Sequence, residues 1–319
     1  MEQYIGHPNQ IYGVEEMRLV GGHGDGMRML CVRNAAGLSF MVSADRAADI
    51  VRLSVKGDNY AYFSPCGFVS PTYYDKNAFL SSFTAGFCTT CGLTAVGNPC
   101  VDDGEETVLH GTVSNIPCEN IYHFIENGEI HIRATVRDAS LFGRKLLLER
   151  EYVCPINKNE IRMTDKITNI GTADAPLEVL YHCNMGYPLL DENAKLTIPH
   201  HGVRARNEHA ETGLATAAVV EPPQRGYTEM CFYYEMSGTP TVTLMNEKLG
   251  RGVSITYDTR ELPFFTEWKM MGEGEYVLGL EPGNCLPDGR AAQRAMGRLE
   301  ILAPGAEKTH HLTFGFPEM

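Results

Sequence analysis

Apolar and polar side chains alternate along many segments of the chain. EIHIRATVRDA (129–139) and IRMTDKITNIG (161–171) alternate almost strictly, and the second ends in an Asn-x-Gly turn. Such alternation is typical of antiparallel β-strands with one buried face and one face in water. Both segments are therefore predicted to be antiparallel strands.

Shorter apolar segments, many of them bounded by Gly, Pro, Asn or Asp, cover much of the remaining chain. MRMLCVRN and LSFMVS, on either side of a break at 35–37, predict a β-hairpin, and residues 47–57 continue the pattern. Later segments of this kind are LEVLYHCNMG, MCFYYEM, TVTLMNEKLG, GVSITYD, YVLGLEPG, GRLEILAPG and HHLTFGF. No long amphipathic helix, heptad repeat or low-complexity linker separates them, and PPQRG at 222–226 is interpreted as a loop. The pattern predicts an all-β protein in which residues 1–319 form a single antiparallel β-sandwich or barrel domain.

Residues 60–105 follow neither periodicity. They are rich in Gly, Pro, Cys and aromatic residues, as in YAYFSPCGFVSPTYY and SSFTAGFCTTCGLTAVGNPC. Excursions of this length usually build a binding site. We expect this segment, with a short helix, to form one wall of a pocket.

The acidic composition restricts the class of partner. A formal net charge of −13 argues against nucleic acid or an anionic membrane surface, because both are bound through excess Lys and Arg. The N-terminal segment lacks a basic region followed by an apolar one, and no stretch reaches the ~18 apolar residues of a membrane helix. We expect a cytoplasmic protein that binds a small molecule, with no nucleic-acid or membrane partner.

The ten cysteines do not form a recognisable metal or redox motif. Cys88 and Cys91 make a C-x-x-C pair, but no second pair or nearby His pair completes a zinc set. In a long chain without a secretion signal, reduced and mostly buried thiols are expected. We predict that this pair packs in the core.

Residues of three Gly- or Pro-containing stretches are candidates for acid–base chemistry. Alternation along LEVLYHCNMG puts His182 on one face with Asn184, and Glu281 follows the apolar strand YVLGL. His110 precedes Gly111 in a loop-like segment. Each also has an ordinary explanation, as a core histidine bonded to a carbonyl, a solvated carboxylate at a strand end, or a surface histidine.

Five further residues are candidates for ligand contacts. Arg46, Lys269 and Arg290 are the candidate cations, although each also fits a surface charge, and Asp49 follows Arg46 after two small residues. Trp268, the sole tryptophan, lies between Glu267 and Lys269. An aromatic face beside polar groups is what a pyranose ring commonly stacks on.

Taken together, the order of these motifs resembles the aldose 1-epimerase (galactose mutarotase-like) superfamily, and more narrowly a DUF4432-like branch of it. The stretches that carry the resemblance are DRAADI, TCGL, LHGTVSN, YHCNMGYPLLDE and LEPGN. It implies a large antiparallel β-sandwich with a sugar in a cleft across one concave sheet. It also implies His182 as general acid, Glu281 as general base and His110 as a hydrogen-bond partner of the ring region. The sequence CNMGYPLL departs from the aromatic-Asn-Leu that follows the histidine in the better-known mutarotases.

Interconversion of sugar anomers requires a base at the anomeric hydroxyl and an acid at the ring oxygen, so one carboxylate and one imidazole suffice. We predict an aldose 1-epimerase that uses no cofactor and no metal. Arg46, Asp49, Asn184, Trp268 and Lys269 are the predicted substrate contacts. The expected imidazolium of His182 is favoured by a nearby carboxylate.

Two alternatives keep the same pocket. An isomerase or lyase for an acidic, phosphorylated or oxidised sugar would use Arg46 or Lys269 to hold the anionic group, with a metal on His110, His182 and Glu281 as one version. A carbohydrate-binding protein without activity needs the pocket but no acid–base pair.

Overall fold

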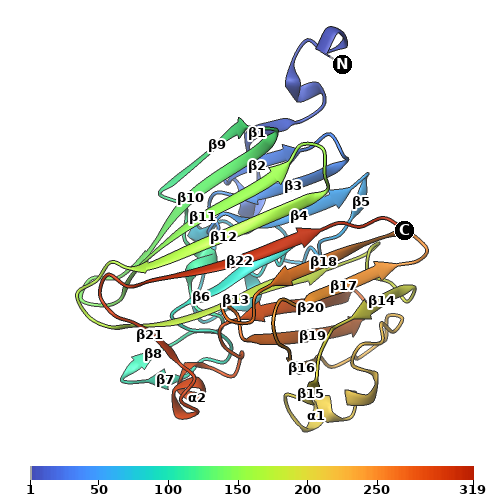
Figure 1. Ribbon diagram of the computed structural model, residues 1–319. Helices are drawn as coiled ribbons and strands as arrows, with labels where there is room; N and C mark the ends of the chain where they lie inside the picture. Colours follow the sequence, from blue (N-terminus) through green and yellow to red (C-terminus); the bar gives the residue numbers. More distant parts are fainter. Residues whose placement is uncertain (1) are drawn as a thin grey trace.

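Two large antiparallel β-sheets form most of the structure, a computed structural model that describes residues 2–319 (Figure 1). The first sheet has twelve strands, ten of them in the order β1-β2-β3-β4-β6-β13-β20-β19-β16-β15, while β5 pairs with β4 and β21 with β13. The bounds in this sheet are β1 (Gly13–Arg18), β2 (Arg28–Arg33), β3 (Leu38–Ser43), β4 (Asp49–Val55), β5 (Asp58–Asn59), β6 (Cys88–Leu93), β13 (Ala175–Met185), β15 (Gly202–Ala205), β16 (Met230–Glu235), β19 (Phe264–Gly272), β20 (Glu275–Gly283) and β21 (Glu300–Leu302).

The second sheet has eight strands in the order β14-β17-β18-β22-β12-β11-β10-β9. Its strands are β9 (Asn120–Glu126), β10 (Glu129–Ala139), β11 (Lys145–Pro155), β12 (Glu160–Asn169), β14 (Ala194–Thr197), β17 (Thr241–Asn246), β18 (Arg251–Tyr257) and β22 (Glu307–Gly315). A third, two-stranded sheet joins β7 (Val101–Asp102) to β8 (Glu105–Glu106). The all-β antiparallel fold predicted from alternation is confirmed, and of the sandwich and the barrel it is the sandwich that the structure shows.

The helices are short. They are α1 (Glu208–Glu211), α2 (Arg290–Ala295) and the 3₁₀ turns η1 (Glu2–Tyr4), η2 (Pro8–Gln10), η3 (Gly22–Gly24), η4 (Pro71–Tyr73), η5 (Phe79–Ser81), η6 (Val113–Asn115) and η7 (Leu214–Thr216). Within residues 2–319 no helix has the length and apolar character needed to cross a membrane. PPQRG at 222–226 lies in a loop, as predicted.

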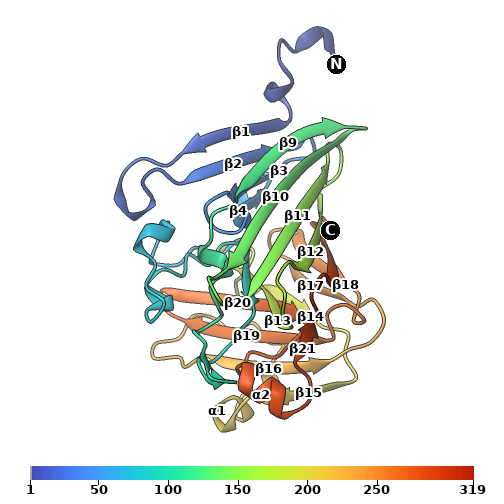
Figure 2. The same cartoon turned by 90° about the vertical axis from the view of Figure 1, so that its left-hand side faces the viewer.

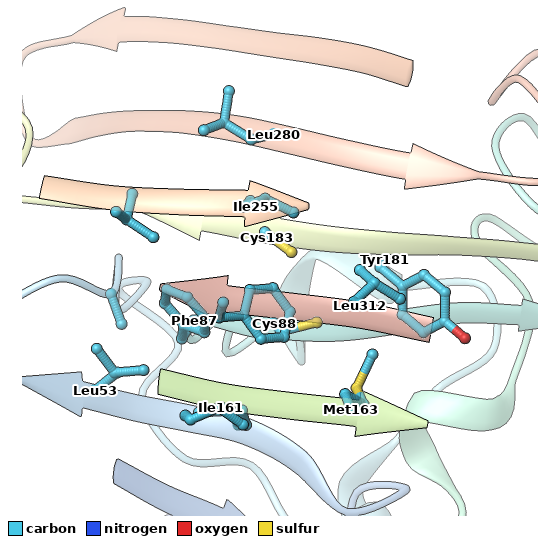
Figure 3. Close-up of a cluster of buried hydrophobic side chains, with 14 of the residues drawn as sticks. Leu53, Phe87, Cys88, Ile161, Met163, Tyr181, Cys183, Ile255, Leu280 and Leu312 are labelled. Carbon is cyan, nitrogen blue, oxygen red and sulfur yellow. The ribbon is translucent and has the colours of Figure 1, made fainter. Parts of the chain in front are cut away.

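The core lies between the two large sheets, where their apolar side chains meet (Figure 3). Tyr181 and Leu280 come from the first sheet, and Met163 and Leu312 from the second. The Tyr181 hydroxyl donates a hydrogen bond of 2.8 Å to Asp165 on β12. Residues 181 and 280 therefore face the second sheet, and their neighbours in sequence face the opposite side of the first sheet.

That opposite side is covered by loops between β5 and β9, including η4 and η5 (Figure 2). The predicted excursion over 60–105 is wrong in one part, because β6 runs through it between β4 and β13. All six residues of β6 are buried, so no alternation marks this strand in the sequence. Cys88 and Cys91 pack inside it, and all ten cysteines, which lie within residues 2–319, are free thiols.

Candidate active site

His182 and Glu281 meet on the outer face of the first sheet. His182 lies on β13 and Glu281 on the neighbouring strand β20, each one residue after a side chain that faces the core. The His182 Nε2 and Glu281 Oε1 atoms are 3.2 Å apart. Both side chains are buried, with 6% and 2% of their side-chain surface exposed. The two atoms are in contact, but the contact does not meet hydrogen-bond geometry, and Glu281 Oε1 makes no hydrogen bond within residues 2–319.

Three aromatic rings surround the His182 imidazole. The ring centroids of Phe83, His110 and Trp268 lie 5.3, 5.6 and 5.2 Å from that of His182, and all three rings are steeply inclined to it. Phe83 and His110 belong to the covering loops and Trp268 to β19. The rings pack around the imidazole, which has only 6% of its side-chain surface exposed.

The His110 loop is locked onto β6 by backbone contacts. His110 adopts a left-handed conformation at φ 57°, and its carbonyl accepts a hydrogen bond of 3.0 Å from the Gly92 amide. A Cβ atom on Gly111 would lie 2.3 Å from the Gly92 carbonyl oxygen. Only glycine permits this close approach, which holds the His110 ring beside His182.

A second glycine makes room for the carboxyl group of Glu281. A Cβ atom on Gly279 would lie 2.3 Å from Glu281 Oε1 and 2.9 Å from Trp268 Cβ. Gly279 is therefore required by the positions of the carboxyl and the indole.

These residues line a cleft of about 400 Å³. Its walls come from both the sheet strands and the covering loops. The lining residues are Phe79, Leu80, Phe83, Asn98, Pro99, Leu109, His110, His182, Arg206, Glu229, Cys231, Thr266, Trp268, Glu281 and Pro287. The size suits a small organic ligand.

Burial determines the charge state of the acid–base pair. It lowers the pKa of His182 to about 3, and the neighbouring His110 adds to the effect. Burial raises the pKa of Glu281 well above its ordinary value; the charge of Glu229 adds to this and that of Arg206 opposes it. Burial thus favours a neutral imidazole beside a protonated carboxyl. It opposes the expected imidazolium of His182, because desolvation disfavours the charged ring.

Several buried polar atoms in the cleft wall make no hydrogen bond within residues 2–319. They include Nδ1 of His110, Nδ1 of His182 and Oγ1 of Thr266. Burial and Arg206 also lower the pKa of His110 to about 4, so its ring is neutral near neutral pH. Unpaired buried polar atoms are costly, and a bound ligand with many hydroxyl groups would satisfy them.

The structure brings four of the eight predicted site residues to the cleft: His110, His182, Glu281 and Trp268. Asn184 lies on the same face of β13, but its amide donates to the carbonyl oxygens of Gly86 and His182, at 3.1 and 2.8 Å. Its side chain is completely buried and is not among the lining residues.

Arg46, Asp49 and Lys269 lie outside the cleft, where other groups take up their charges. Arg46 donates to the carbonyl oxygens of residues 69, 82 and 114. Asp49 accepts hydrogen bonds of 2.8 Å from Arg150 and 2.6 Å from Thr90 in the core. Lys269 donates to the carbonyl oxygen of residue 216.

Arg290, the remaining candidate cation, is also buried outside the cleft. Its guanidinium forms ion pairs of 2.7 Å with Asp102 and Glu105. These partners explain why a positive charge is tolerated there.

Arg206 and Glu229 also line the cleft, although they were not predicted as site residues. Arg206 follows β15, and its Nη2 atom donates to Asn98 Oδ1 and to the Pro287 carbonyl, each at 3.0 Å. Glu229 precedes β16 and accepts a hydrogen bond of 2.5 Å from the Trp268 indole. Among the described residues that line the cleft, Arg206 is the only Lys or Arg. No Gly, Pro or apolar pattern marks either residue in the sequence.

Within the described chain, no three His, Cys, Asp or Glu side chains are grouped so that they could hold a metal ion. The His110, His182 and Glu281 set therefore does not have the arrangement that the metal-assisted alternative requires.

Solved structures share this two-sheet fold. A candidate aldose 1-epimerase from Klebsiella pneumoniae superposes with a TM-score of 0.90 at 26% identity, over 96% of this chain and 83% of that one. A galactose mutarotase-like protein from Clostridium acetobutylicum gives 0.71 at 12% identity, over 98% and 100% of the two chains. A galactose 1-epimerase from Lactobacillus acidophilus superposes with a TM-score of 0.65 at 13% identity, over 96% of this chain and 99% of that one. The fold is thus that of the galactose mutarotase-like proteins, the superfamily expected from the sequence.

The chain belongs to the DUF4432 family, described as a domain of unknown function, whose sequence profile matches residues 24–316. No curated protein matches the sequence.

Proposed function

We propose that the protein is an isomerase of the aldose 1-epimerase type, which interconverts the anomers of a sugar by opening and reclosing its ring. The observation that carries this proposal is the His182–Glu281 pair, 3.2 Å apart at the wall of a cleft of about 400 Å³. The likeness to candidate and named epimerases supports the same reaction class.

The pair supplies the two proton transfers that ring opening needs. One group must donate a proton to the ring oxygen while the other accepts the proton of the anomeric hydroxyl. Burial favours the proton on Glu281, so the carboxyl is the donor and the neutral His182 the acceptor. This starting state is the reverse of the roles that the resemblance implies. Reclosure of the ring after rotation about the C1–C2 bond restores both groups.

The remaining cleft residues would orient the sugar. Trp268 offers an aromatic face, and Thr266 presents an unpaired hydroxyl beside Glu281. Arg206 donates hydrogen bonds and Glu229 accepts them. A pyranose has apolar faces and a rim of hydroxyl groups, and this combination of side chains complements both.

The test is anomer exchange measured by NMR magnetisation transfer on D-galactose and D-glucose. His182→Asn and Glu281→Gln should each lower the exchange rate by about 10²–10⁴. His201→Asn and Glu273→Gln, both at exposed positions, serve as matched controls and should leave it unchanged. Undiminished exchange in both site variants would remove the assignment. Sugar binding without turnover in the parent protein would instead indicate a binding protein.

A second candidate function is an isomerase for an acidic sugar, and Arg206 is the observation that favours it. Its Nη2 donors are occupied, but Nη1 has only the Cys231 sulfur, 3.9 Å away, as an acceptor. A carboxylate is a stronger acceptor than a thiol. Faster turnover of D-glucuronate than of D-glucose, abolished in Arg206→Gln, would favour this candidate.

A further inference from the structure

A second hollow adjoins the cleft on the side of the covering loops. It measures about 430 Å³ and is lined by Lys76, Asn77, Ala78, Phe79, Leu80, Ser81, Pro99, Thr107, Val108 and Leu109. We call it the outer hollow. It shares Phe79, Leu80, Pro99 and Leu109 with the cleft, so the two spaces have a common wall. The two spaces therefore lie side by side, within reach of one ligand that is longer than a single sugar ring.

The common wall is apolar and partly open. Leu80 is 72% exposed at the surface of η5, whereas Phe79 beside it is buried and stacks on Phe83 with ring centroids 5.0 Å apart. Phe79 is thus held in place by packing. Leu80 lines both hollows and is exposed to solvent. When a ligand covers an exposed apolar side chain at a binding site, the removal of apolar surface from water stabilises the complex.

The outer hollow combines apolar and polar side chains. Leu80 and Val108 give it apolar surface, while the exposed Lys76, Asn77 and Ser81 add polar groups. This mixture fits a second sugar ring, which has an apolar face and a rim of hydroxyl groups, better than it fits a purely apolar chain.

We propose that the outer hollow is a binding subsite for a second saccharide unit, so that the protein acts on reducing disaccharides in preference to monosaccharides. This inference rests on the proposed function, because the reducing ring must place C1 at His182 and Glu281. The second ring is attached through the C4 or C6 oxygen of the reducing ring and covers Leu80. Binding free energy from that ring raises the rate at C1.

The experiment compares kcat/KM for anomer exchange of D-glucose, lactose, maltose and melibiose, which all carry glucose as the reducing ring. At least one disaccharide should exceed D-glucose by about tenfold, as expected for an additional apolar contact. Val108→Trp, which fills the outer hollow alone, should abolish the excess and leave the D-glucose rate unchanged. Ser81→Trp is a second variant of the same kind at an exposed position, and Val20→Trp, 93% exposed and outside both hollows, is the control.

Failure of this inference differs from failure of the proposed function. If D-glucose is turned over and every disaccharide is equal to it or slower, the subsite does not exist while the epimerase assignment stands. The subsite is also refuted if the folded Val108→Trp and Ser81→Trp variants lose kcat/KM equally for D-glucose and for the disaccharides. If no sugar is turned over, both proposals fail.

Discussion

Replacing Glu281 with Gln should stabilise the folded protein at neutral pH, although the residue belongs to the proposed catalytic pair. Burial raises the pKa of the Glu281 carboxyl well above its ordinary value of 4.5. The unfolded chain releases this proton as the pH rises through 4.5, whereas the folded protein retains it to higher pH. A raised pKa in the folded state therefore costs stability above pH 4.5, and none of this cost is present below it.

The size of the effect follows from proton linkage. Each proton that the folded chain holds and the unfolded chain does not costs about 1.4 kcal/mol per pH unit. Glu281→Gln removes this cost. The free energy of unfolding of the variant should therefore exceed that of the parent by an amount that grows with this slope from pH 5 upward, while the carboxyl stays protonated. Glu267, buried on the other face of β19, shows how large such a cost can be, because burial raises its pKa to about 8. Over the interval from 4.5 to 7, that shift amounts to about 3 kcal/mol.

The assay is urea denaturation at pH 5, 6 and 7, followed by the fluorescence of the sole tryptophan, Trp268. The parent, Glu281→Gln and Glu267→Gln are compared with the exposed-site control Glu273→Gln. An ion pair of Glu281 with a protonated His182 predicts the opposite sign, because the variant would strand a buried imidazolium. A Glu281→Gln variant that is less stable than the parent at pH 7 would therefore refute the neutral pair.

Three further predictions concern the same cleft. On the acid side, the kcat/KM of the parent should fall only near pH 4 and below, where His182, with a pKa of about 3, begins to gain a proton. On the alkaline side it should fall as Glu281, whose pKa is raised by burial, loses its proton; an acid limb with a midpoint near 6.5 would contradict this. Gly279→Ala should fold but lose about 10²-fold in kcat, because its Cβ displaces the Glu281 carboxyl; unchanged kcat in the folded variant would contradict this. Trp268→Ala should raise KM for D-glucose by up to about tenfold through the lost stacking surface, and an unaltered KM would show that the sugar does not stack there.

The strands were predictable where one face is buried and the other is in water. β10 and β12 alternate almost strictly, and both were predicted from that pattern. β6 was missed because it is buried on both faces, where polar threonines and glycine take the place of an apolar run. Burial on both faces removes the signal by which alternation reveals a strand.

The cleft was predictable only in part. Glycine and strand position singled out His182 and Glu281, but the resemblance alone gave them a common site, because nothing in the pattern shows that β13 and β20 are neighbours. Alternation also predicted that His182 points away from Tyr181. It did not show which face meets the second sheet; Tyr181 bonds to Asp165 there, so His182 lies on the outer face.

Charged residues were the least predictable. Asp49 pairs with Arg150, which lies 101 residues further along the chain on the other sheet, so its role depends on a contact that the sequence does not reveal. Arg206 reaches the cleft from the end of a four-residue edge strand, β15. A long flexible side chain can serve a site from a segment with no pattern of its own.

The central claim is that one imidazole and one carboxyl act on the same edge of a sugar ring. A crystal structure of the Glu281→Gln variant with bound D-glucose tests it most directly. We expect the anomeric hydroxyl and the ring oxygen to lie within hydrogen-bond distance of the side chains at 182 and 281, one oxygen to each. A glucose bound with C1 turned away from both side chains would contradict it.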